Sequence, residues 1–152
     1  PEMNKKMTAV PTSTPDLMKI RQQKTILIAE DSRMLRDLLL GTLHTAGYNT
    51  VSNENGQEAW DKLEAMVEGD APVTDTIQMI ITDIEMPQMD GHHLTKRIKS
   101  HPRLKELPVV IFSSLINEEM RLKGEALGAY AQVTKPEIEQ LIGIVDQKIA
   151  HQ

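Results

Sequence analysis

Short apolar runs recur along the chain from Thr25 onward, and longer amphipathic segments separate them. Most of these runs are rich in β-branched residues, which favour strands, and turn-forming or polar residues bound them. Runs of this length are typical of strands buried in a sheet. We expect strands at Thr25–Ala29, Asn49–Asn53, Ile77–Thr82, Pro108–Ser113 and Ala131–Thr134.

Apolar residues at helical spacing follow each run, and this spacing predicts a helix after every strand. Parallel strands need crossover connections, which are usually helices, so the alternation predicts an α/β domain whose parallel sheet is covered on both faces. The apolar positions are Leu35, Leu38, Leu39 and Leu43; Ala59, Leu63, Met66 and Val67; Leu94 and Ile98; Met120, Leu122 and Leu127; and Ile138, Leu141, Ile142, Val145 and Ile149.

The composition is that of one ordinary domain, because 152 residues with 39% hydrophobic content can bury a single core. There is no cysteine, which excludes disulfides, thiolate metal sites and cysteine nucleophiles. No apolar run approaches the roughly 18 residues of a membrane span, and the first residues lack the apolar centre of a signal peptide. We therefore expect a soluble, cytoplasmic protein without membrane insertion.

Charge is distributed unevenly along the chain. Residues 1–24 carry five basic and two acidic side chains, a net charge of +3, which leaves −8 for the remainder. So acidic a domain is a poor partner for nucleic acid, whose phosphates need clustered Lys and Arg. The segment from Pro11 to Pro15 favours extended backbone and offers no apolar face. We expect residues 1–23 to be a flexible linker and residues 24–152 to form the domain.

Polar side chains follow the expected strands at the edge where ligands bind in parallel α/β sheets. Glu30 and Asp31 follow the first strand, Asp83 follows the third, Ser113 ends the fourth and Lys135 follows the fifth. Three converging carboxylates repel one another unless a cation joins them, and oxygen ligands without His or Cys suit Mg²⁺. A carboxylate can also attack phosphorus, while an ammonium and a hydroxyl hold the phosphoryl oxygens. The set therefore predicts phosphorylation on aspartate.

These spaced motifs resemble those of receiver domains in two-component response regulators, over residues 25 to 149. The resemblance implies a flavodoxin-like (CheY-like) doubly wound sheet of five parallel strands in the order 2-1-3-4-5. The motifs are the acidic pair Glu30-Asp31, the segment DIEMPQMDG from Asp83 to Gly91, the Ser113 hydroxyl and the dipeptide Lys135-Pro136.

The same resemblance implies roles for individual residues. Asp83 would be the phosphoacceptor, with Ser113 and Lys135 contacting the phosphoryl group. Such a domain accepts its phosphoryl group from a histidine kinase and assists the chemistry without being a conventional enzyme. The implied Mg²⁺ ligands are Glu30, Asp31, Asp83 and the backbone carbonyl of Ile84.

Within the family, the chain looks most like the receiver domain of CheV-type chemotaxis coupling proteins. An upstream coupling domain would then link it to a chemoreceptor-kinase array, an expectation that fits a chain starting at Pro1 without an initiator methionine. A stand-alone response regulator and an unphosphorylated interaction domain remain alternatives. A haloacid-dehalogenase-like phosphatase is disfavoured, because that family needs a second acid two residues after the nucleophile and then a Thr, whereas here Glu85 holds that position and Met-Pro follows it.

Several residues depart from the family pattern or have structural explanations. Gln132 stands where receiver domains usually carry an aromatic switch residue, so we expect that switch to be absent and the rearrangement to be modest. Ser113 stands where Thr is common, so we expect function to be retained with weaker coupling. Asp90 precedes Gly91 in a turn signal, and Glu85 is expected at the mouth of the site without binding metal. The adjacent His92 and His93 point in different directions and are not expected to be ligands.

Overall fold

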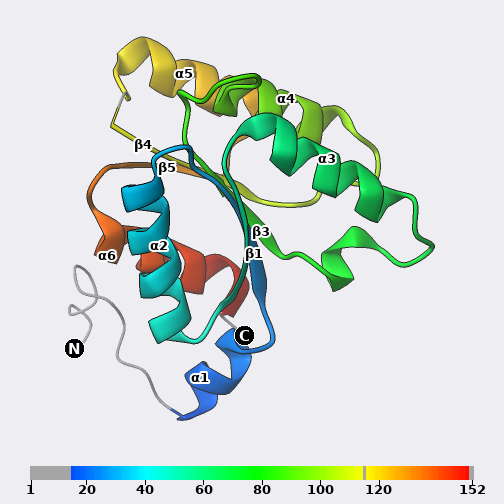
Figure 1. The fold of residues 1–152 in the computed structure, drawn as a ribbon, viewed down its shortest axis with the longest axis vertical. Helices are drawn as coiled ribbons and strands as arrows, with labels where there is room; N and C mark the ends of the chain where they lie inside the picture. Colours follow the sequence, from blue (N-terminus) through cyan, green and yellow to red (C-terminus); the bar gives the residue numbers. More distant parts are fainter. Residues whose placement is uncertain (1–14, 115, 151–152) are drawn as a thin grey trace.

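The computed structural model describes residues 15–114 and 116–150, which form a three-layer α/β domain (Figure 1). Its parallel five-stranded sheet has the order β2-β1-β3-β4-β5, which confirms the expected flavodoxin-like fold. The strands are β1 (Thr25–Ala29), β2 (Asn49–Asn53), β3 (Met79–Thr82), β4 (Val109–Ser113) and β5 (Ala131–Thr134).

Two strands begin later than the sequence pattern indicated. Strand β3 starts at Met79, because the N–H of Ile77 donates to the carbonyl of Val73 instead of entering the sheet. Strand β4 starts at Val109, because proline has no N–H to contribute at position 108. Pro108 still accepts a 3.0 Å hydrogen bond from the N–H of Ile80.

Helices cover both faces of the sheet. The sheet separates the hydrophobic core into two clusters, one on each face. Helices α1, α2 and α6 pack on one face, where Leu39, Leu43 and Leu141 are buried. Helices α3 and α4 cover the other face with Leu63 and Ile98. The bounds are α1 (Pro15–Arg21), α2 (Arg33–Ala46), α3 (Gly56–Val67), η2 (Val73–Asp75), α4 (Gly91–Ser100), α5 (Glu118–Leu127), α6 (Ile138–Val145) and η3 (Asp146–Ala150).

Helix α5 is only loosely packed at the edge of the sheet. Gly124 is its one buried residue, and Leu122, which the apolar spacing placed on an inner face, is 51% exposed. This helix adjoins α4 and β5.

The expectation of a linker over residues 1–23 needs correction for the segment that the structure describes. Residues Pro15–Arg21 form α1, whose Leu17 and Ile20 pack against the core. Arg21 is fully buried because it pairs with Asp146, at the other end of the domain sequence. Residues 1–14 lie outside the described part of the chain. Within that part, no helix is long and apolar enough to span a membrane.

Candidate functional site

The two central strands bring the acidic residues to one edge of the sheet. Ala29 and Thr82 are register partners, so the residues that follow them leave the sheet side by side. The N–H of Asp83 donates to the carbonyl of Ala29 at 3.0 Å, which extends the strand pairing to the first residue of the loop. Glu30 and Asp83 are buried despite their charge.

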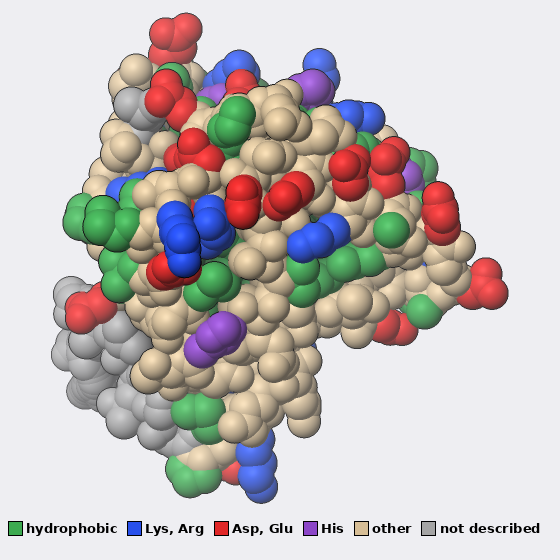
Figure 2. Space-filling view, in the orientation of Figure 1, with side chains coloured by type: hydrophobic (Ala, Val, Ile, Leu, Met, Phe, Trp, Pro, Cys, Tyr) green, Lys and Arg blue, Asp and Glu red, His purple; other side chains and the backbone are tan. Residues whose placement is uncertain are grey.

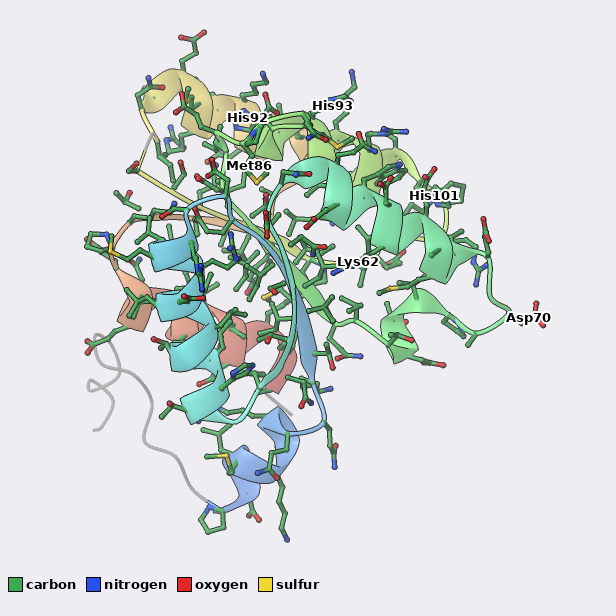
Figure 3. The ribbon with its side chains drawn as sticks, viewed as in Figure 1. Lys62, Asp70, Met86, His92, His93 and His101 are labelled. Carbon is green, nitrogen blue, oxygen red and sulfur yellow. The ribbon has the colours of Figure 1, made fainter. Side chains whose placement is uncertain are left out.

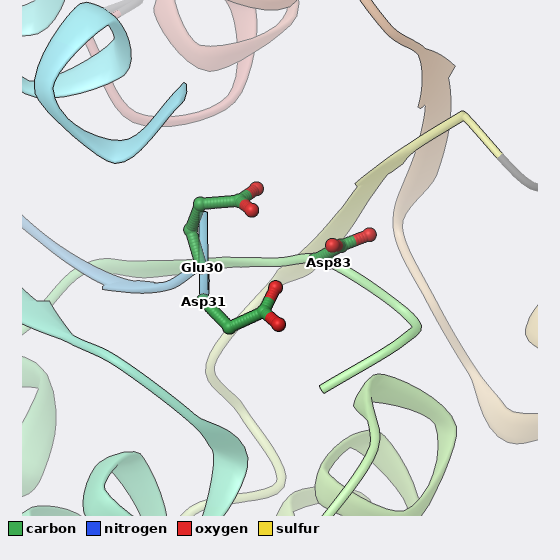
Figure 4. Close-up of side chains that lie close together, drawn as sticks. All are labelled: Glu30, Asp31 and Asp83. Atoms are coloured by element: carbon green, nitrogen blue, oxygen red, sulfur yellow. The ribbon is translucent and has the colours of Figure 1, made fainter. Parts of the chain in front are cut away.

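Glu30, Asp31 and Asp83 form one cluster of carboxylates at this edge (Figure 4). Each offers an oxygen atom, and these atoms lie within 4.8 Å of one another. Only oxygen donors are present in the cluster, and such donors suit a hard cation such as Mg²⁺. The residues present therefore fit the metal that the family resemblance implies.

Lys135 supplies the positive charge inside the cluster. Its Nζ lies 2.7 Å from Glu30 Oε1 and 3.3 Å from Asp83 Oδ2, and its side chain is 8% exposed. Water screens this contact poorly, because all of the partners are buried. The structure thus joins the residue after β5 to residues that follow β1 and β3.

The pKa of Glu30 is raised above its ordinary value, chiefly because burial penalises the charged carboxylate. The nearby charge of Asp83 adds to this effect. The hydrogen bond with Lys135 and the Ser32 N–H, which lies 3.1 Å from Glu30 Oε2, both act in the opposite direction. A site that crowds carboxylates in this way gains stability from an added cation.

Ser113 ends β4 as expected, and its side chain is buried. It pairs in register with Thr134, and its carbonyl accepts a 3.1 Å hydrogen bond from the N–H of Lys135. The hydroxyl-bearing residue and the lysine are therefore held on adjacent strand ends. Their assignment as phosphoryl contacts stays a prediction.

The backbone of Ile84 is already hydrogen-bonded on both sides. Its N–H donates to Asp83 Oδ1 at 2.7 Å, and its carbonyl accepts from the N–H of Gly91 at 2.8 Å. A carbonyl oxygen has two lone pairs. The hydrogen bond from Gly91 uses one of them, and the other can still bind a metal ion. Its role as a ligand remains a prediction.

Asp90 and Gly91 shape the loop, in agreement with the structural role expected for them. Asp90 is the N-cap of α4 and accepts a 2.7 Å hydrogen bond from the N–H of His93. Gly91 packs so closely that a Cβ atom there would lie 1.9 Å from the carbonyl oxygen of Asp83. Only a residue without a side chain fits against the acidic loop at this point.

A surface hollow opens beside the cluster and is lined by Asp31, Glu85, Met86 and Asp90. Glu85 is exposed at its rim, as expected for a residue at the mouth of the site. The labelled Met86, His92 and His93 lie around this end of the domain in Figure 3. In the view of Figure 2, most of the visible Asp and Glu side chains lie on the half of the molecule away from α1.

Arg36 is a supporting residue that the sequence reasoning did not identify. Its Nη1 donates to the backbone carbonyl of Glu30 at 2.7 Å, from the second turn of α2. This contact fixes the backbone at the acidic pair. Its position one helical turn beyond the N-cap Ser32 was the signal that could have indicated it.

Gln132 is a half-buried residue of β5 that contacts α5. Its Nε2 donates to the carbonyl of Arg121 at 2.9 Å, and a Cβ atom at Gly124 would lie 2.5 Å from its Oε1. Gln132 therefore occupies the space below α5 where the family pattern has an aromatic residue.

The comparisons with known proteins agree with this geometry. A family model described as "Response regulator receiver domain" matches residues 26–146. Chemotaxis protein CheY1 of Helicobacter pylori is 30% identical over 118 residues, which cover 77% of this chain and 89% of that protein. Chemotaxis protein CheV3 of the same species is 29% identical over 127 residues, which cover 82% of this chain and 40% of that protein.

A solved structure of similar fold is that of the phosphorylated cyanobacterial phytochrome response regulator RcpA. It is 30% identical, with a TM-score of 0.68 and coverage of 82% of this chain and 90% of that one. The matched region spans 17% of the Myxococcus xanthus gliding motility regulatory protein and 40% of CheV3. The chain thus corresponds to only part of these longer relatives.

Proposed function

The chain belongs to the response regulator receiver domain family, and we propose that Asp83 accepts a phosphoryl group from a histidine kinase. The observation that carries this proposal is the buried contact of Lys135 with Glu30 and Asp83 beside Asp31. This arrangement brings together a nucleophilic carboxylate oxygen, three carboxylates that can bind a metal ion, and the ammonium group of Lys135. An interaction domain without phosphorylation would not need all three.

The residues of the site divide the work of phosphoryl transfer among them. A carboxylate oxygen of Asp83 attacks phosphorus in line while the P–N bond to the kinase histidine breaks, so the product is an acyl phosphate. Glu30, Asp31 and Asp83 would hold Mg²⁺, which neutralises charge on the transferring group. Lys135 pairs with a phosphoryl oxygen, and the Ser113 hydroxyl donates a hydrogen bond to another.

We propose that the signal leaves through α5, β5 and α6. Phosphorylation adds charge and acceptor oxygens that Ser113 and Lys135 can bind, so the loops after β4 and β5 tighten toward Asp83. The domain exchanges between two conformations, and phosphorylation shifts that equilibrium. The free energy of this shift cannot exceed the difference in how strongly the phosphoryl group interacts with each conformation. Because Gln132, which contacts α5, stands in place of the aromatic switch residue, we expect a modest rearrangement.

For the biological setting, we propose a cytoplasmic chemotaxis pathway in which this domain modulates receptor-kinase coupling. The similarity to CheV3 supports a domain that works beside an upstream coupling domain. The similarity to CheY1 is equally compatible with the alternative of a stand-alone regulator. The two are separated by asking whether the purified chain alone alters the activity of a reconstituted receptor-kinase array.

The proposed phosphorylation is tested by incubating the chain with acetyl phosphate and Mg²⁺ and recording its intact mass. We expect an increase of one phosphoryl group, which disappears when Mg²⁺ is chelated or when Asp83→Asn is used. Glu85→Gln, an exposed change at the rim of the site, is the matched control and retains the increase. Full incorporation in Asp83→Asn would move the acceptor elsewhere, and no incorporation in the unchanged chain would favour a pure interaction domain.

A further inference from the structure

Helix α1 is held to the C-terminal end of the domain by a buried ionic contact. Arg21 Nε donates to Asp146 Oδ1 at 3.0 Å, and Arg21 Nη2 donates to Asp146 Oδ2 at 2.6 Å. Arg21 is fully buried and Asp146 is 7% exposed. Two parallel hydrogen bonds between a guanidinium and a carboxylate define the orientation of both groups. The contact therefore specifies where α1 sits.

The same contact includes the turn between α2 and β2. Arg21 Nη1 donates to the carbonyl of Ala46 at 3.0 Å, and the Tyr48 hydroxyl donates to Asp146. The guanidinium carbon of Arg21 lies 5.9 Å from the centre of the Tyr48 ring. We call Arg21, Tyr48 and Asp146 the α1 lock. It joins α1, the turn between α2 and β2, and the start of η3.

The lock is connected to the acidic site by one continuous helical element. Asp146, the C-cap of α6, has helical backbone angles of −58° and −42°, so α6 continues directly into η3. This element starts at Ile138, shortly after Lys135, which contacts Glu30 and Asp83. In Figure 1 it runs from the loop after β5 to the neighbourhood of α1. One end thus follows the acidic site by a short loop, and the other end carries Asp146 of the lock.

The ionic character of the lock is not explained by stability alone. Replacing a buried ion pair with apolar residues of similar size is often neutral or stabilising, whereas the pair defines one geometry. None of the three lock residues belongs to the acidic site. A polar network that adopts one arrangement is suited to respond when the element carrying Asp146 moves.

We propose that the α1 lock couples the phosphorylation state of Asp83 to the docking of helix α1. When the loop after β5 tightens toward a phosphoryl group, α6 and η3 shift, and Asp146 changes its fit to Arg21 and Tyr48. The inference rests on the proposed function. By linkage, if a phosphoryl mimic changes the equilibrium constant for docking of α1 by some factor, docking of α1 changes the affinity of the site for that mimic by the same factor.

The test is amide hydrogen exchange of the full chain with Mg²⁺, with and without beryllofluoride. We expect beryllofluoride to change the exchange of residues 17–22 by about fivefold, the lower end of measured couplings. In the triple variant Arg21→Met, Tyr48→Phe, Asp146→Leu, this change is lost while residues 131–138 still respond. Lys19→Met removes an exposed charge from the same helix and retains the full response.

The possible outcomes separate this inference from the proposed function. A response at residues 131–138 without any change in α1 of the unchanged chain overturns the coupling and leaves the proposed function intact. A response in α1 that persists in the triple variant overturns the role of the lock. If neither region responds to beryllofluoride, the proposed function fails and the coupling fails with it. The unchanged chain decides the coupling even if the triple variant does not fold.

Discussion

The ammonium group of Lys135 lies 2.7 Å from the Glu30 carboxylate, which joins the loop after the last strand to the loop after the first. The contact is buried on both sides, so its strength depends little on salt. Lys135 Nζ also lies 3.3 Å from Asp83 Oδ2. A phosphoryl group on Asp83 would therefore compete with the Glu30 carboxylate for the Lys135 ammonium.

Lys135→Met should strengthen Mg²⁺ binding while abolishing the response to a phosphoryl mimic. Removing the ammonium leaves the buried carboxylates uncompensated, which favours binding of a metal cation. Titration calorimetry measures the Mg²⁺ affinity, and amide shifts with beryllofluoride measure the response. An unchanged response in residues 131–138 would show that Lys135 does not transmit the signal. Lys105→Met, an exposed change far along the surface, is the control.

Beryllofluoride should perturb the amides of residues 114–138 more than those around Trp60 in α3. The loops that end β4 and β5 carry the groups that bind the phosphoryl oxygens, whereas α3 packs against β1 and β2, at the end of the sheet away from β5. Two-dimensional amide NMR of the free and bound forms makes the comparison. If the largest amide shifts outside the acidic site fell in α3, the output face would be a different one.

Gly91→Ala should destabilise the domain and weaken Mg²⁺ binding. Its Cβ would lie 1.9 Å from the Asp83 carbonyl oxygen, so the backbone of the acidic loop must move. Overpacking of this kind costs about 1–3 kcal/mol. Urea unfolding with and without Mg²⁺ measures both effects. Gly143→Ala in α6, where a Cβ would meet nothing within 4 Å, should be neutral or stabilising. Equal behaviour of the two variants would contradict the close packing at Gly91.

The domain should lose stability as the pH falls below about 6.5 through the titration of His92. Burial lowers the pKa of His92, and repulsion by Lys123 adds to this, while Asp90 acts in the opposite direction. The unfolded chain therefore binds the proton first. The stabilising contribution is complete above the ordinary value of 6.5 and is lost as the pH falls toward the lowered pKa.

The measurement is urea unfolding at a series of pH values between 5 and 7.5 for the unchanged chain and His92→Leu. The variant should show a flatter profile over this range. His93→Gln changes the exposed neighbour and should keep the original profile. A slope that survives in His92→Leu would assign the pH dependence to another group.

Arg21→Met alone should cost about 3–5 kcal/mol of the free energy of unfolding, because it leaves Asp146 buried without its partner. Arg21→Met combined with Asp146→Leu should recover most of that loss, since no charge then remains buried. Urea denaturation of both variants and of Lys19→Met gives the comparison. If the single and double variants were equally unstable, the loss would come from packing of α1 and not from the unpaired carboxylate.

Much of the site followed from local sequence pattern. Asp83 and Ser113 stand at the ends of apolar runs whose burial on both faces indicates central parallel strands, and such strands all end at one edge. The order of the sheet came from the family resemblance and is confirmed. The starts of β3 and β4 were misplaced, because a buried residue such as Ile77 looks the same in a strand and in a turn.

Other features depended on tertiary structure. Arg21 and the residues before it carry a Pro-rich, basic pattern that resembles a linker, and only the carboxylate of Asp146, contributed from the far end of the chain, makes burial of that guanidinium possible. Likewise, the sequence predicted that Lys135 and Glu30 would share one edge, but not that they would touch. Apolar periodicity reports which face of an element is buried, since that depends on near neighbours in sequence. Contacts between charged side chains depend on where the fold places distant segments, and only the three-dimensional structure determines that.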